Sequence, residues 1–188
     1  MKENFSPQES LQLIQSMIEK TRDNISTNRF YFLMWGWVTL VAVLCQFMLK
    51  VFLEYRLHYL VWLAVIPAAI VTMIKGRKDH NVNHKSYVGE SMGALWFGLG
   101  IGFFILSIII PFSVGWMKAW PFFILFYGMG TFISGKLIQF KPLVYGGVTC
   151  WILAIVTVFV PYDYQLLLAA AAILISYIIP GHLIKRNS

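Results

Sequence analysis

The chain has 188 residues, of which 59% are hydrophobic and 12% are charged, and its mean hydropathy is +0.69. Soluble domains carry about 25% charged residues, so this composition excludes an ordinary soluble protein and indicates a chain covered by lipid. The formal net charge of +7 would favour nucleic-acid binding in a soluble protein, but membrane topology accounts for it here, and we expect no nucleic-acid partner.

The first 29 residues predict a cytoplasmic amphipathic helix ahead of the first membrane span. Ser6-Pro7-Gln8-Glu9 has the pattern of a helix start, with a capping serine and a proline at the first helical position. Apolar residues then recur at helical spacing, and the balanced charges favour contact with protein over attraction to anionic lipid. The positions that we expect to dock on a partner are Leu11, Ile14, Ile18 and Ile25. The alternative is that this helix only anchors the first span.

Six apolar stretches follow, each close to the 20 or so residues that a helix needs to cross the hydrocarbon layer. They predict an all-α, polytopic fold in which residues 30–188 form a six-helix transmembrane bundle with antiparallel neighbours. Pro67 predicts a kink midway along the second helix, and Pro180-Gly181 predicts the end of the sixth. The expected spans are about 30–49, 57–74, 92–112, 120–138, 142–160 and 165–179.

Lysine and arginine residues lie mainly on one side of this topology. Twelve fall in the N-terminal segment, the 75–91 link, the turn between the fourth and fifth spans and the C-terminal tail, whereas three fall on the other side. Basic residues concentrate on the cytoplasmic side of membrane proteins, so both termini are predicted to be cytoplasmic.

Two stretches of the sequence resemble each other and raise the hypothesis of an internal repeat. Trp35-Gly36-Trp37-Val38-Thr39 matches Tyr145-Gly146-Gly147-Val148-Thr149, and the even-numbered spans all end in glycine followed by a basic residue or histidine. One interpretation is three copies of a helical hairpin. We favour the alternative, in which glycine and basic residues recur at inner helix ends for reasons of topology.

No residue pattern in the chain predicts chemistry. The middle of every predicted span lacks ionisable residues, which argues against a proton pump, an ion-coupled carrier and hydrolysis by paired carboxylates. His80 and His84 have the spacing of metal ligands on a helix but lack a second ligand pair. We therefore predict no catalytic, metal or cofactor site, and we expect a protein that is not an enzyme.

Small and polar residues inside the spans predict helix contacts. Packing within the bundle, or else a dimer face, is expected at Gly98, Gly102, Gly130 and Ser134. Other polar side chains lie at similar depths, where they line a small pocket for a neutral or lipid-like ligand or hydrogen-bond within the bundle. These pocket candidates are Thr39, Tyr127, Thr131 and Thr149.

The chain resembles a group of small, uncharacterised bacterial membrane proteins with six spans and no established activity. The resemblance rests on packing and helix-end motifs and covers most of the chain; the segments are Glu9-Ser10-Leu11 with Met17-Ile18, Trp35-Gly36-Trp37, Phe132-Ile133-Ser134-Gly135, Phe140-Lys141-Pro142-Leu143, and Gly146-Gly147 with Cys150-Trp151. It implies a bacterial inner membrane and transfers no functional residue.

Our leading hypothesis is a non-enzymatic accessory or regulatory subunit. It would engage a partner protein, or a second copy of itself, through the first helix and the 75–91 link. The alternative is a small carrier or channel for an uncharged or lipid-like solute, built from the first, fourth and fifth spans. An intramembrane enzyme comes third.

Overall fold

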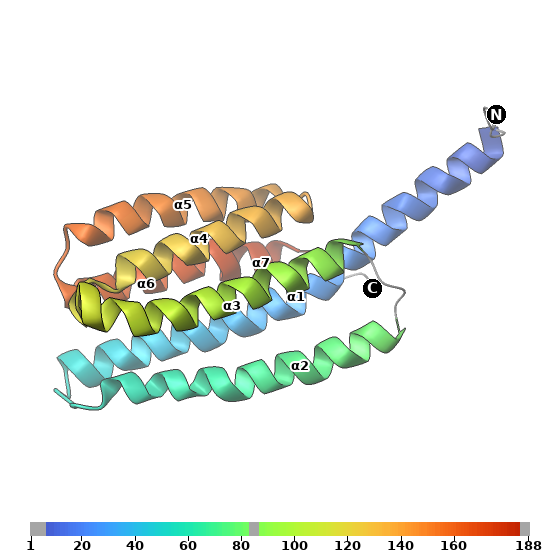
Figure 1. Ribbon diagram of the computed structural model, residues 1–188. Coiled ribbons are helices and arrows are strands. Elements are labelled where there is room, and N and C mark those ends of the chain that lie inside the picture. The colour runs from blue at the N-terminus through green and yellow to red at the C-terminus, as the bar shows by residue number, and fades with distance from the viewer. Residues whose placement is uncertain (1–6, 83–86, 185–188) are drawn as a thin grey trace.

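The computed structural model describes the backbone of residues 7–82 and 87–184, and the side chains of 29–77 and 88–184. All regular elements in these ranges are helices, which confirms the predicted all-helical class (Figure 1). The elements are α1 (Pro7–Val51), the 3-10 helix η1 (His58–Ala64), α2 (Val65–Val82), α3 (Tyr87–Ser113), the short 3-10 helix η2 (Trp116–Lys118), α4 (Trp120–Leu137), α5 (Lys141–Val158), α6 (Tyr162–Ile173), the π-helical segment η3 (Leu174–Ile178) and α7 (Ile179–Leu183).

Five helical segments are long and apolar enough to cross a membrane, which indicates a membrane protein. They are Arg29–Val51, His58–Arg77, Val88–Ser113, Lys141–Val158 and Tyr162–Leu183. The remaining predicted span, the fourth (about 120–138), corresponds to α4, which has 18 residues, as many as α5. Its glycines and Lys136 reduce its apolar character, and it is not among the five.

Three helices extend beyond their predicted spans at the end of the bundle where the N-terminal segment leaves it. α1 is helical from Pro7, the first residue described, and continues without a break through the expected boundary at residues 29/30. α2 continues to Val82 and α3 starts at Tyr87, so the predicted 75–91 link is helical on both sides. Within that link, His84 lies outside the described residues.

The two prolines for which the sequence predicts an effect both lie next to a change of helix type. The second span starts as the 3-10 helix η1 and becomes α-helical only at Val65, two residues before Pro67, and the kink at Pro67 stays a prediction. The sixth span continues past Pro180 to Leu183, because the wider π turn just before it makes room for the ring where an α-helix would clash.

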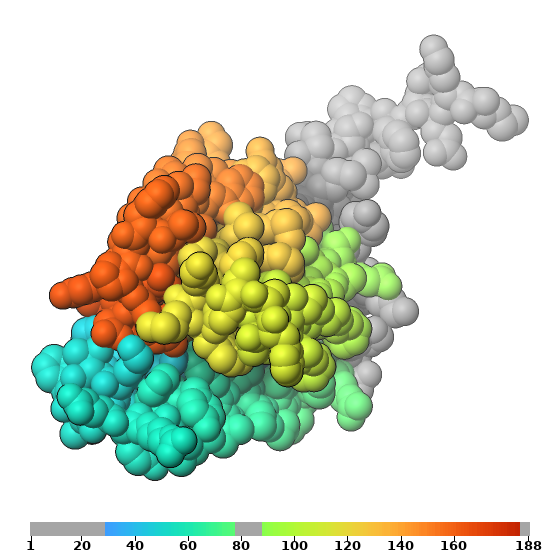
Figure 2. All heavy atoms as spheres, turned by 60° about the vertical axis from the view of Figure 1, so that its left-hand side comes forward, coloured from blue at the N-terminus to red at the C-terminus, as the bar shows by residue number. Residues whose placement is uncertain are grey.

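The C-terminal span lies at the centre of the bundle. In the most apolar 18-residue stretch of this span, 56% of the residues are buried inside the protein. The corresponding buried share is 33% for the spans in α1 and α5, 11% for α3 and 6% for α2. α2 and α3 therefore lie on the outside, where Figure 2 shows the teal-green residues of α2 and the yellow-green residues of α3. Their exposed faces are apolar, as lipid contact requires.

Glycines bring the central helices into backbone contact. A methyl group added at Gly147 of α5 would lie 2.7 Å from the backbone nitrogen of Phe132 in α4, and one at Gly128 of α4 would lie 3.0 Å from the carbonyl oxygen of Gly147. A methyl group at Gly146 would lie 2.7 Å from the Cα of Ser176 in η3. The helix pair α4–α5 is thus held as closely as two backbones allow.

The two similar stretches of sequence meet the same element of the structure. Gly36 of α1 faces Tyr177 and Ile178, and Gly146 of α5 faces Ser176, so both glycines contact η3. In both stretches the threonine hydroxyl donates to a carbonyl oxygen one turn earlier: Thr39 to Trp35 in α1, and Thr149 to Tyr145 in α5. This likeness covers α1 and α5 only, and the hypothesis of three hairpins stays a prediction.

Replacing Gly147 with alanine is expected to lower the free energy of unfolding by about 1–3 kcal/mol, because the new methyl group forces α4 and α5 apart. Thermal unfolding in detergent, followed by helical circular dichroism, measures the loss. The matched control is Gly98→Ala in α3, where nothing lies within 4 Å of the added methyl group. Equal stability of the two variants would contradict the close contact.

Candidate functional site

Three aromatic rings from different helices meet in the centre of the bundle. The rings of Tyr127 (α4) and Tyr177 (η3) lie 4.7 Å apart, and Trp96 (α3) lies 5.7 Å from Tyr177 and 6.4 Å from Tyr127. The indole nitrogen of Trp96 donates to the hydroxyl of Ser134 at 3.0 Å. This central cluster joins α3, α4 and η3 through one hydrogen bond and mutual ring contact.

Two hydroxyl groups of the same region are buried without a hydrogen-bond partner among the described residues. They are the phenol oxygen of Tyr127 and the Oγ of Ser176, which is itself fully buried. The hydroxyl of Thr39 lies beside the first and the thiol of Cys150 beside the second, but neither neighbour completes a hydrogen bond of good distance and angle. An unpaired buried hydroxyl costs about 1–3 kcal/mol, so each group has the capacity to bind a small polar molecule. Ser176 lies in the π-helical segment, a type of distortion that is frequent at functional sites.

The structure places three of the four predicted pocket residues near this cluster. Thr39 lies beside Tyr127, and Thr131 is fully buried beside Tyr177. Thr149 lies on a partly exposed side of α5. The hydroxyls of all three threonines donate to carbonyl oxygens of their own helices, at 2.6–2.9 Å, so their protons are already used.

The predicted packing residues lie mostly between α3 and α4. Gly102 faces Phe126, Gly130 faces Trp96 and Leu99, and Ser134 is fully buried as the acceptor for Trp96. Gly98 instead faces open space on the outer side of α3. Packing within the bundle, rather than a dimer face, therefore fits the positions of Gly102, Gly130 and Ser134.

A second polar network, which the sequence pattern does not predict, lies at the opposite end of the bundle from the N-terminus. Gln46 of α1 is 3% exposed, and its side-chain oxygen accepts a hydrogen bond of 2.8 Å from the indole of Trp62. Its amide nitrogen lies 3.2 Å from Nδ1 of His58 and 3.5 Å from the hydroxyl of Tyr162. One glutamine thus ties η1 and α6 to α1.

An ion pair closes the same network. The ammonium of Lys50 binds the carboxylate of Asp163, and it also lies 4.4 Å from the centre of the Tyr162 ring. Lys50 lies in the last turn of α1 and Asp163 in the first turn of α6, so the pair holds the α1–α2 link against the α5–α6 link, seen as cyan beside orange in Figure 2. The contacts explain how this end is closed and require no ligand.

The length of α1 is the feature that reaches furthest from the bundle. The helix has 45 residues, and its span from Arg29 to Val51 uses 23 of them. At 1.5 Å per residue, the remaining residues, 7–28, extend about 33 Å. Figure 1 shows this blue segment leaving the bundle beyond the end that carries the α4–α5 turn. The predicted docking residues lie in it, and their side chains are outside those that the structure describes.

Within the described side chains, no group of three His, Cys, Asp or Glu residues lies close enough to hold a metal ion. Comparison with protein-family models, with curated proteins and with solved structures found no match to this chain.

Replacing Ser134 with alanine is expected to lower the free energy of unfolding by about 0.6–1.7 kcal/mol, because the buried indole of Trp96 loses its acceptor. Tyr127→Phe is the contrasting variant: it removes a hydroxyl that has no described partner, so stability should be unchanged or higher. Unfolding by a denaturing detergent in mixed micelles measures both. A loss for Tyr127→Phe as large as that for Ser134→Ala would mean that the phenol is hydrogen-bonded in the folded protein.

Proposed function

We propose that this protein is a non-enzymatic accessory or regulatory subunit of a membrane complex, which binds a partner protein through the cytoplasmic end of α1. The observation that carries the proposal is the continuity of α1, which runs from the membrane span into an extension of about 33 Å (Figure 1). A span needs no such extension, whereas a rigid helix that holds a recognition surface at a fixed distance from the membrane does.

The sequence of this extension supports a protein partner. Its apolar positions Leu11, Ile14, Ile18 and Ile25 follow each other at intervals of three, four and seven residues, which places them on one face of the helix. An isolated helix of this length is marginally stable in water, and an apolar face gains most of its stability from being covered. The balanced charges of the segment favour a groove on another protein over an anionic lipid surface.

The alternative function, a small carrier or channel, draws on the central cluster. The unpaired hydroxyls of Tyr127 and Ser176 favour it, because a polar solute would find partners there. The threonines predicted to line its pocket use their hydroxyl protons within their own helices, however. The partner hypothesis accounts for the largest projecting feature of the chain, and for that reason we prefer it.

We also propose that the chain crosses a bacterial inner membrane six times, with both termini in the cytoplasm. The antiparallel arrangement supports it: the N-terminal extension, the α2–α3 connection and the α4–α5 turn lie toward one end of the bundle (Figure 1). The twelve basic residues assigned to the cytoplasm belong to the segments at this end and to the C-terminal tail. In this topology α4 is the fourth span, although it is the least apolar.

Single cysteines at Arg56, Arg77 and Tyr164, all exposed positions, test the number of spans and their direction. A membrane-impermeant maleimide applied to intact cells is expected to label Arg56→Cys and Tyr164→Cys, and to label Arg77→Cys only after the inner membrane is permeabilised. The native Cys45 and Cys150 lie within spans. A five-span chain in which α4 does not cross would protect Tyr164→Cys until permeabilisation.

A photo-crosslinking residue introduced at each position from 8 to 28 of the full-length chain tests the docking helix in living cells. Adducts with one protein of constant mass are expected to recur with a period near 3.6 residues and to be strongest at Leu11, Ile14, Ile18 and Ile25. Gels of the crosslinked membranes, with mass spectrometry of the adduct, give the measurement.

The matched controls are Gln12, Ser16 and Asp23, which share the segment but lie on its other face. Adducts of equal strength on both faces, or adducts with lipid alone, would overturn the proposal. Adducts that join two copies of this chain would identify the partner as a second copy.

A further inference from the structure

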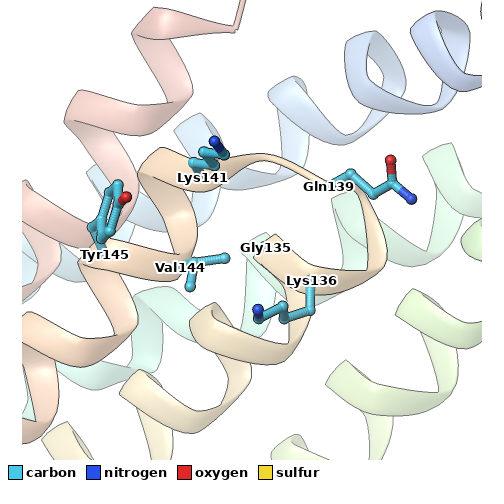
Figure 3. A pocket seen from close by; sticks show the side chains of 6 residues that line it. All are labelled: Gly135, Lys136, Gln139, Lys141, Val144 and Tyr145. Carbon is cyan, nitrogen blue, oxygen red and sulfur yellow. The ribbon is translucent and has the colours of Figure 1, made fainter.

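A hollow lies at the turn between α4 and α5, apart from the central cluster and from the docking helix. It has a volume of about 400 Å³ and is lined by Gly135, Lys136, Gln139, Lys141, Val144 and Tyr145. Figure 3 shows Lys136 and Lys141 on opposite sides of Val144, with Tyr145 beside them and the side chain of Gln139 directed away. Two lysines and one tyrosine are therefore among the residues that line the hollow.

The turn that forms this hollow has a fixed shape. Gln139 adopts a left-handed backbone conformation with φ of 54°, and the amide of Phe140 donates to the carbonyl oxygen of Gly135 at 2.8 Å. These contacts satisfy the end of α4 and direct the chain straight into α5. A methyl group at Gly135 would lie 2.7 Å from the backbone nitrogen of Val144, so the two helix ends are in contact under the hollow.

The two lysines carry charge that the described side chains do not neutralise. The one ion pair among those side chains joins Lys50 to Asp163 at the other end of the bundle. Lys136 lies 5.7 Å from the ring of Phe132, which leaves its ammonium positive and exposed, and Lys141 is exposed as well. Two such charges around one hollow create a positive potential that an anion would lower.

An apolar stripe runs from the hollow along the outer face of α5. It consists of residues three or four positions apart, namely Tyr145, Val148, Ile152 and Ile155, whose exposed fractions are 67%, 39%, 58% and 65%. Within a span, this stripe faces the hydrocarbon chains of lipid. A ligand that fits both features has an anionic head at the lysines and an apolar chain along α5.

The geometry points to a binding site for the phosphate headgroup of an anionic phospholipid at the α4–α5 turn, with one acyl chain lying along the outer face of α5. Basic pockets between helix ends on the cytoplasmic side are suited to such headgroups, and tyrosine is favoured at headgroup depth. The site is independent of the docking helix: it requires only that α4 and α5 lie in the membrane, with their turn at its surface.

Native mass spectrometry of the full-length protein in a mild zwitterionic detergent tests the site. The probes are phosphatidylglycerol and phosphatidylcholine with identical acyl chains. We expect preferential binding of phosphatidylglycerol, and a loss of about 30-fold in its affinity for Lys136→Gln/Lys141→Gln, or about 5-fold for each lysine. The double arginine variant keeps both charges and should restore binding.

The matched control is Arg56→Gln/Lys118→Gln, which removes two exposed charges at the other end of the bundle and should retain full affinity. Equal binding of the two lipids, or an equal loss in the control, would overturn the proposal. Competition by inorganic phosphate shows whether the site binds the headgroup of a phospholipid or a free phosphate ion. If phosphate displaces phosphatidylglycerol at equal concentration, the site takes a free anion and the lipid assignment is wrong.

Discussion

Backbone contact between α4, α5 and the C-terminal helix is the constraint on which the rest of this bundle depends. Lipid tails are as apolar as leucine side chains, so helices in a membrane gain little from burying apolar surface and must associate through close packing. Gly128, Gly146 and Gly147 permit that packing by removing side chains where the helices meet. α1 then joins the same centre through Gly36, while α2 and α3 cover the outside.

Polar groups inside the spans must form their hydrogen bonds within the protein, because no water is present in the hydrocarbon layer to satisfy them. Three tryptophan indoles each bridge two elements: Trp35 to Thr72, Trp62 to Gln46 and Trp96 to Ser134. Threonines in the spans donate to their own backbone and add no demand on their neighbours. Against this background the hydroxyls of Tyr127 and Ser176 are two of the buried polar groups in the described part of the chain whose hydrogen bonding the protein does not complete.

The sequence predicted what depends on local pattern. Apolar length located the five most apolar spans within a few residues, and the spacing of Gly130 and Ser134 indicated helix contact. Other features depend on distant partners. Gln46 pairs with Tyr162 across 116 positions, and one buried glutamine in an apolar stretch gives no signal of that partner. The π turn likewise produces no periodicity of its own in five residues, so the sequence predicts a helix end at Pro180 where the helix in fact continues.

The π turn also determines which neighbour the end of the chain meets. Each residue of an α-helix turns the chain by about 100°, and a π turn holds one residue more, so everything after Ile178 is rotated by about that angle. In this rotated position Gly181 faces Leu33 of α1. A methyl group added at Gly181 would lie 2.8 Å from the side chain of Leu33. The last helical turn is therefore out of phase with α6 although the two are continuous. Evolution can redirect this end of the protein by gaining or losing a single residue, with every upstream contact left in register.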